Sequence, residues 1–224
     1  KNLELFKTLG FPNNRFEDWK FSNFKNIVDK NFKKLDTKIT YSDKNKVNLL
    51  KDFEHNYIFL INGNLSSSDF KHEDKKKIKI NSYDKSTEHA ITKNPLICLN
   101  HALAENGFSL EIDKDYKFKK VLVIYNFFDD NLKNKILNIK NKINIHDNSE
   151  VHVIEYTINE SKSKFINNVY EKIILGKNSN FKNLLIQGNR NNGIFHKFIK
   201  NELFFNSNCT NLIFSSGLKF NKID

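Results

Sequence analysis

The chain is poor in the residues that cross-link a protein or interrupt its regular structure. It contains two cysteines, two prolines and seven glycines in 224 residues, and it has no methionine. Secreted scaffolds of small modules carry many more thiols, so a disulfide framework is excluded. The length is enough for one large or two modest domains with a substantial buried core.

Long hydrophobic runs are also missing. Residues 1–10 alternate charged and apolar side chains and do not form the apolar core of a signal peptide. No stretch approaches the ~20 apolar residues that a membrane span needs. We therefore expect a soluble, cytoplasmic protein without a membrane partner.

Arginine is nearly absent, although the net charge is +11. Only Arg15 and Arg190 of the 37 basic residues are arginine, and the densest lysine run, residues 75–77, is short. Base readout and bidentate phosphate contacts favour the guanidinium group. We therefore expect no nucleic-acid partner, although a basic module that attracts phosphate without sequence preference remains an alternative.

Residues 1–107 are predicted to form a region of helices mixed with other elements. Apolar residues at helical spacing before Gly10 and Pro12 predict a first helix. Asn14 and Glu17 predict a capped turn that starts the next helical segment.

Two further elements are expected before residue 108. The aromatic and β-branched run 57–62, ended by Gly63, predicts a buried strand. Residues 64–93 are polar and predict a loop or a weakly folded excursion. Asn94 and Pro95 predict the start of a helix that ends by Gly107.

The pattern changes after Gly107 to short runs in which apolar and polar residues alternate. Polar clusters separate many of these runs, at residues 146–150, 159–164, 176–180, 188–193, 206–209 and 215–217. Turn signals every 8–14 residues or so are typical of an all-β sandwich, barrel or solenoid. No proline follows Pro95, so nothing prevents a strand from pairing on both sides.

We favour a parallel β-helix over a sandwich. Asn and Gly in the turns tolerate the left-handed backbone of sharp corners, and the alternating pattern runs up to residue 224 without a capping element. The predicted fold class is α+β, with a small helical amino-terminal region, 1–107, followed by the first rungs of a right-handed parallel β-helix, 108–224. We expect this core to be incomplete and to continue beyond the chain end.

Reactive side chains form few convincing patterns. Cys98 and His101 have half of a zinc-site spacing, but no second pair completes it, so we expect a buried thiol and a histidine on the helix surface. His152 and Glu155 would lie on opposite faces of one strand as independent surface residues. We interpret Asp113, Asp115, Asp129 and Asp130 as ordinary turn residues. The sequence therefore predicts no catalytic, cofactor-binding or metal-binding residue.

The segment from Gly10 to Ser22, GFPNNRFEDWKFS, carries a more specific pattern. It closely resembles the amino-terminal signature of the SufB/SufD family, in which a Gly-Leu-Pro turn leads through basic residues to Glu-Asp-Trp-Lys-Tyr-Thr. The matching positions are Gly10, Pro12, Arg15, Glu17, Asp18, Trp19 and Lys20, with Phe21 and Ser22 as close replacements. Asn14 departs from the pattern, because a basic residue is common there.

Later segments are similar to the same family in order and spacing. Residues 57–63 resemble its strand ending in Asn-Gly, residues 99–107 its Leu-Asn-x-Ala helix, and residues 151–224 the rhythm of its first β-helix repeats. The likeness is closer to SufD than to SufB, because the helical region is short and leads directly into the Asn-Gly strand.

The resemblance implies a non-catalytic scaffold subunit for iron–sulfur cluster assembly, which pairs with a SufB-like subunit and works with a SufC-like ATPase. The iron–sulfur cluster and ATP belong to the whole complex, and no cofactor is expected on this segment. The family contacts SufC through a carboxy-terminal helical domain that this chain lacks. The family's cluster-building residues lie in later rungs, so none is transferred, and Cys209 and His196 do not match them.

For the signature itself, the resemblance and the residue types predict that Trp19 packs the helical region on the β-helix. A docking surface for a transient partner is the other interpretation. Two other functions stay open at this point, a β-helix enzyme acting on carbohydrate and a basic nucleic-acid-binding module.

Overall fold

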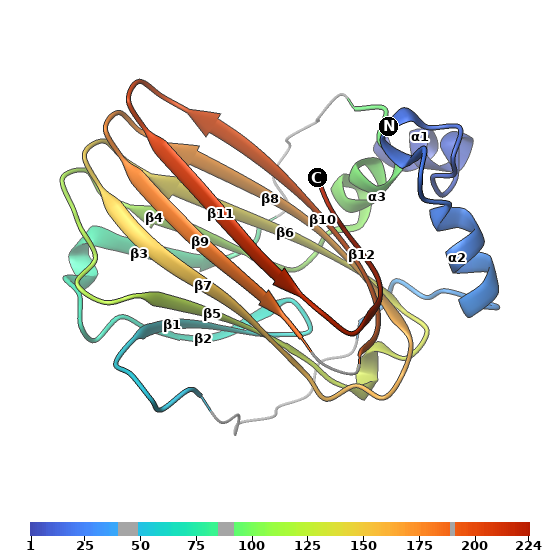
Figure 1. Cartoon of the computed structure of the whole chain (residues 1–224), viewed down its shortest axis with the longest axis horizontal. Coiled ribbons are helices and arrows are strands. Elements are labelled where there is room, and N and C mark those ends of the chain that lie inside the picture. Colours follow the sequence, from blue (N-terminus) through green and yellow to red (C-terminus); the bar gives the residue numbers. More distant parts are fainter. Residues whose placement is uncertain (40–48, 85–91, 189–190) are drawn as a thin grey trace.

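The computed structural model describes residues 1–39, 49–84, 92–188 and 191–224 (Figure 1). Within these residues, the strands form two six-stranded sheets. The first sheet has the order β11-β9-β7-β5-β1-β2, and the second has the order β12-β10-β8-β6-β4-β3. Their outer faces point in opposite directions, and the main core lies between them.

The strands of the first sheet are β1 (Asn56–Ile61), β2 (Asn64–Asp69), β5 (Leu122–Phe128), β7 (Glu150–Asn159), β9 (Asn180–Gln187) and β11 (Asn208–Ser215). Those of the second sheet are β3 (Ile78–Ser82), β4 (Phe108–Ile112), β6 (Ile136–Ile145), β8 (Phe165–Leu175), β10 (Asn191–Leu203) and β12 (Leu218–Ile223).

From β5 onward the chain alternates between the two sheets, and from β6 onward each strand pairs in parallel with the strand two places earlier. This winding is a β-solenoid of about four turns, which confirms the predicted α+β fold with a β-helix. Strands from before residue 108 extend both sheets, because β1 pairs in parallel with β5, and β3 pairs antiparallel with β4.

An asparagine ladder marks one row of corners. Asn148, Asn178 and Asn206 have φ of 58°, 55° and 54°, the left-handed region that asparagine tolerates. Each side-chain amide donates to the preceding turn: Asn206 to Asn178 at 2.9 Å, Asn178 to Asn148 at 3.1 Å, and Asn148 to Asp115 at 2.7 Å. The expected role of asparagine in sharp corners is confirmed.

The helical elements are α1 (Asn2–Leu9), the 3-10 turn η1 (Glu17–Trp19), α2 (Phe24–Asn31) and α3 (Pro95–Leu103). Figure 1 shows α1, α2 and α3 together at one side of the solenoid. Asn94 caps α3 as expected, since its Oδ1 accepts from Leu96 N and Ile97 N. Within the described part of the chain, no helix has the length and apolar character needed to cross a membrane.

Two local predictions are wrong. The expected excursion over 64–93 contains β2 and β3, while its residues 85–91 lie outside the described part. Asn62 and Gly63 both have positive φ, 48° and 79°, which makes them a tight turn that folds β2 back onto β1. The expected capping by Asn14 and Glu17 is absent: η1 has no side-chain cap, and Asn23 caps α2 by accepting from Asn26 N.

Candidate functional site

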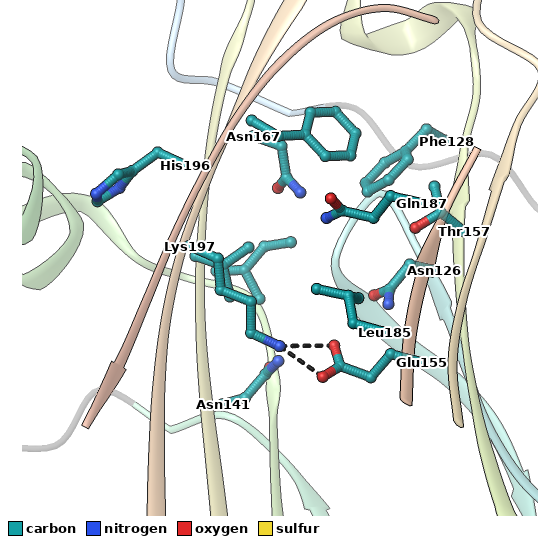
Figure 2. A pocket seen from close by; sticks show the side chains of 13 residues that line it. Asn126, Phe128, Asn141, Glu155, Thr157, Asn167, Leu185, Gln187, His196 and Lys197 are labelled. Carbon is teal, nitrogen blue, oxygen red and sulfur yellow. Dashed lines mark hydrogen bonds and ion pairs between the residues drawn. The ribbon is translucent and has the colours of Figure 1, made fainter. Parts of the chain in front are cut away.

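Three ionisable side chains meet inside the solenoid, between the two sheets. Glu155 on β7, Glu171 on β8 and Lys197 on β10 are between 1% and 7% exposed. Lys197 Nζ donates to Glu155 Oε1 at 2.6 Å and Oε2 at 2.7 Å (Figure 2). It also lies 2.9 Å from Glu171 Oε1. We call these three residues the interior ion cluster.

Neighbouring amides orient the two carboxylates. Asn183 Nδ2 donates to Glu155 Oε1 at 2.7 Å, and Asn141 Nδ2 donates to Glu171 Oε2 at 3.4 Å. Burial disfavours the charged form of an acid, so these contacts offset part of the cost of holding two carboxylates in a dry interior.

The pKa values of the interior ion cluster follow from burial and mutual charge. Burial raises the pKa of Glu171, and the negative charge of Glu155 raises it further, while Lys197 acts in the opposite direction. Burial lowers the pKa of Lys197, but the two carboxylates outweigh burial and leave this pKa above its usual value. Lys197 is therefore charged at neutral pH.

The space beside the cluster is small. Asn126, Thr157, Asn167 and Gln187 contribute polar groups to a cavity of about 20 Å³ that Glu155 and Lys197 also line (Figure 2). A cavity of this size holds about one water molecule. The arrangement can hold charge and a proton in place, but it has no room for an organic substrate.

Sequence reasoning placed Glu155 on the surface, and this is wrong. The prediction that His152 and Glu155 lie on opposite faces is confirmed, because His152 is exposed, with its Nε2 2.9 Å from Glu150 Oε1, whereas Glu155 is buried. The sequence does indicate the inward position of Glu155. Alternate residues of a strand point to the same face, and Glu155 lies two and four residues after the core residues Val153 and Val151.

The signature residue Trp19 joins the helical region to the solenoid. Its side chain is 1% exposed, and its ring lies 5.4 Å from Phe24, 6.3 Å from Phe220 and 5.5 Å from His196. Lys222 Nζ lies 5.0 Å from its ring centroid, in a cation–π arrangement. The packing role expected for Trp19 is confirmed.

His196 is buried against the ring of Trp19. Its Nδ1 is 2.9 Å from Asn168 Oδ1, and its Nε2 is 3.4 Å from Asp224 Oδ2. Burial lowers its pKa, although the contact with Asp224 opposes this effect. The residue therefore serves as a neutral, packed part of this junction near pH 7.

Cys98 and His101, which the sequence analysis considered as half of a zinc site, do not belong to the interior ion cluster. Cys98 is buried in α3, where burial raises the pKa of its thiol, as expected of a packed cysteine. His101 is not simply on the helix surface, because it is half-buried with its ring 4.6 Å from that of Tyr170. Among the described residues, no group of three or more His, Cys, Asp or Glu side chains could hold a metal ion.

The outside of the first sheet carries two apolar rows across adjacent strands. Parallel register aligns Ile154, Leu184 and Leu212 in one row and Tyr156, Ile186 and Phe214 in the other. We call these six residues the outer apolar face. Exposure increases toward the edge strand β11, where Leu212 is 57% and Phe214 is 66% exposed.

The same rows are covered at the other end of the sheet. There, Val123 and Tyr125 on β5 are fully buried, with Leu49 and Leu50 packed against their cluster. Leu50 N donates to Tyr125 Oη at 3.1 Å. On the outside of the first sheet, the exposed part of the two rows therefore lies on β7, β9 and β11. An exposed apolar patch is typical of an interaction site.

These features define a parallel β-solenoid with a buried ion cluster in its interior, an anchored helical region and an apolar outer face. The chain matches no protein-family model, and no curated protein matches it.

Proposed function

We propose that this protein is a non-catalytic scaffold subunit of the SufB/SufD type, working in iron–sulfur cluster assembly. The observation that carries the proposal is the outer apolar face, presented on a rigid stack of paired strands. Each inner strand pairs on both sides, so the stack can hold partners at a fixed separation.

The signature supports the same proposal. Trp19 belongs to the segment that resembles the family, and its ring packs against Phe24 of α2, His196 of β10 and Phe220 of β12. A segment with this packing role keeps the helical region in one position relative to the outer faces of the solenoid.

We propose that a SufB-like subunit covers the outer apolar face. A SufC-like ATPase would join through a part of the complex outside this chain. In this proposal the iron–sulfur cluster is cargo, and both the cluster and ATP are handled by the assembled complex.

The alternative of a carbohydrate-active enzyme has less support. A glycosidase needs two carboxyl groups flanking a bound sugar. Glu155 and Glu171 are buried and contact one lysine, beside a cavity of about 20 Å³.

Co-expression with the SufB-like subunit of the same genome tests the proposal. The tagged wild-type chain should retain that subunit on an affinity resin, and the double variant Leu212→Asp/Phe214→Asp should lose it. Thr210→Asp is the matched control, because it places a carboxylate on the same side of β11 outside the two rows. Circular dichroism checks that each variant folds.

Two results would count against the proposal: no capture by the wild-type chain, or equal loss with Thr210→Asp. We also expect that this chain alone does not hold a SufC homologue. Retention of SufC by this chain would contradict the expected domain assignment.

A further inference from the structure

Two side-chain amides point into the cavity beside the interior ion cluster. Asn167 on β8 belongs to the second sheet and Gln187 on β9 belongs to the first. Both residues line the cavity of about 20 Å³, and each is 6% exposed (Figure 2). The two amides therefore reach the same buried space from opposite sheets.

The oxygen atoms of these two amides need hydrogen-bond donors. Asn167 Oδ1 and Gln187 Oε1 are buried, and no group in the described part of the chain donates a hydrogen bond to either atom. Buried polar atoms are normally partnered by protein groups or by ordered water, because burial removes their bonds to bulk solvent. Two such acceptors on one cavity point to a shared ligand.

The charged residues of the cavity restrict the charge of that ligand. Glu155 and Lys197 line the cavity and are already paired with each other at 2.6 Å and 2.7 Å. The ammonium group of Lys197 repels a second cation, and the carboxylate of Glu155 repels an anion. Because amide oxygens only accept hydrogen bonds, the ligand must be a donor. A neutral hydrogen-bond donor meets all three conditions.

The size of the cavity restricts the ligand further. A volume of about 20 Å³ accommodates one water molecule. The two hydrogens of water match the two amide oxygens, and its oxygen can accept from the hydroxyl of Thr157, which lines the cavity and is 9% exposed. Buried waters typically make about three hydrogen bonds, which is the number that these residues supply.

We propose that this cavity is a binding site for one structural water molecule, which bridges Asn167 of the second sheet to Gln187 of the first. The water donates one hydrogen to each amide oxygen and ties β8 to β9 across the interior. It adds a polar link between the sheets next to the ion pair of Glu155 on β7 and Lys197 on β10. The site lies inside the solenoid, so it is independent of the outer apolar face and of the proposed scaffold function.

Oxygen-17 magnetic relaxation dispersion of the full chain tests the site, because it counts the long-lived water molecules inside a folded protein. The double variant Asn167→Leu/Gln187→Leu removes both acceptors and fills the cavity with apolar side chains of similar size. It should hold about one long-lived water molecule fewer than the wild type. Asn208→Leu is the matched control, because it makes the same change at an exposed position of β11, and it should leave the count unchanged.

A second variant leaves the two amides intact. Thr157→Val keeps the side-chain shape and removes only the hydroxyl, so it should shorten the residence time of the water about fivefold, the scale of one lost hydrogen bond. An unchanged count in the folded double variant, an equal loss with Asn208→Leu, or an unchanged residence time in Thr157→Val would overturn the proposal. A urea midpoint that differs between sodium, potassium and choline chloride in the wild type, but not in the double variant, would overturn it in favour of a cation site.

Discussion

Replacing Lys197 by methionine removes the only ammonium group of the interior ion cluster. The two carboxylates then remain buried, because Glu155 and Glu171 are 7% and 1% exposed. Methionine fills a similar volume, so the change isolates charge from packing. Removing one partner of a buried ion pair typically costs 3–5 kcal/mol. We expect the free energy of unfolding to fall by about 4 kcal/mol at pH 7.

The pH dependence of this loss separates charge from packing. Lys197 lowers the pKa of Glu171, so its removal raises that pKa further above the unfolded value. An acid with a raised folded pKa contributes stability below its unfolded pKa, and this stability is lost as pH rises through the folded pKa. The Lys197→Met variant should therefore lose less stability at pH 5 than at pH 8.

Urea unfolding at both pH values measures these effects, with exposed Lys182→Met as the control. Adding Glu155→Gln and Glu171→Gln to Lys197→Met should restore part of the lost stability, because the two repelling charges are gone. A loss below about 1 kcal/mol, or a loss equal at pH 5 and pH 8, would refute this account of the interior.

Three other substitutions test separate parts of the structure. Trp19→Ala should cost about 3–5 kcal/mol in urea unfolding, because it empties the junction between α2 and β12, and a cost under about 1 kcal/mol would contradict the anchoring role. Glu73→Ala removes an acceptor of Asn56 Nδ2, Tyr116 Oη and the amides of Lys119 and Lys120. It should cost about 1–3 kcal/mol and speed hydrogen exchange of those two amides, and unchanged exchange would contradict it. Asn178→Ala should be less stable than Asn178→Gly by roughly 1 kcal/mol, because φ is 55° there, and the reverse order would argue against backbone strain at this corner.

The fold could be predicted from the sequence where local chemistry determines it. The period-two pattern after residue 107, the asparagine corners and the Asn94–Pro95 helix start each depend on residues close together in the chain. The hairpin of β1 and β2 could also have been predicted, although residues 64–93 were expected to be a loop, because Asn62–Gly63 is a strong signal for a two-residue turn.

The interior ion cluster was harder to predict. Parity along β7 places Glu155 inward, and parity along β8 does the same for Glu171, beside Ile173 and Leu175. Their meeting with Lys197 depends on how the turns of the solenoid stack. That stacking register is set by turn lengths, which differ: Asn148 and Asn178 are 30 residues apart, and Asn178 and Asn206 are 28 apart.

The outer apolar face shares this dependence on register. Its six residues lie far apart in the sequence, and only parallel pairing aligns them in two rows. Lys142, Lys172 and Lys200 likewise look scattered in the sequence and are aligned by parallel pairing across the second sheet.

Amide hydrogen exchange of the chain with and without its SufB-like partner tests the scaffold account most directly. We expect the partner to slow exchange in β9 and β11, where the outer apolar face reaches the edge of the first sheet, and to leave β4 and β6 unchanged. Unchanged exchange in β9 and β11 at saturating partner would contradict the proposal that this face is where the subunits meet.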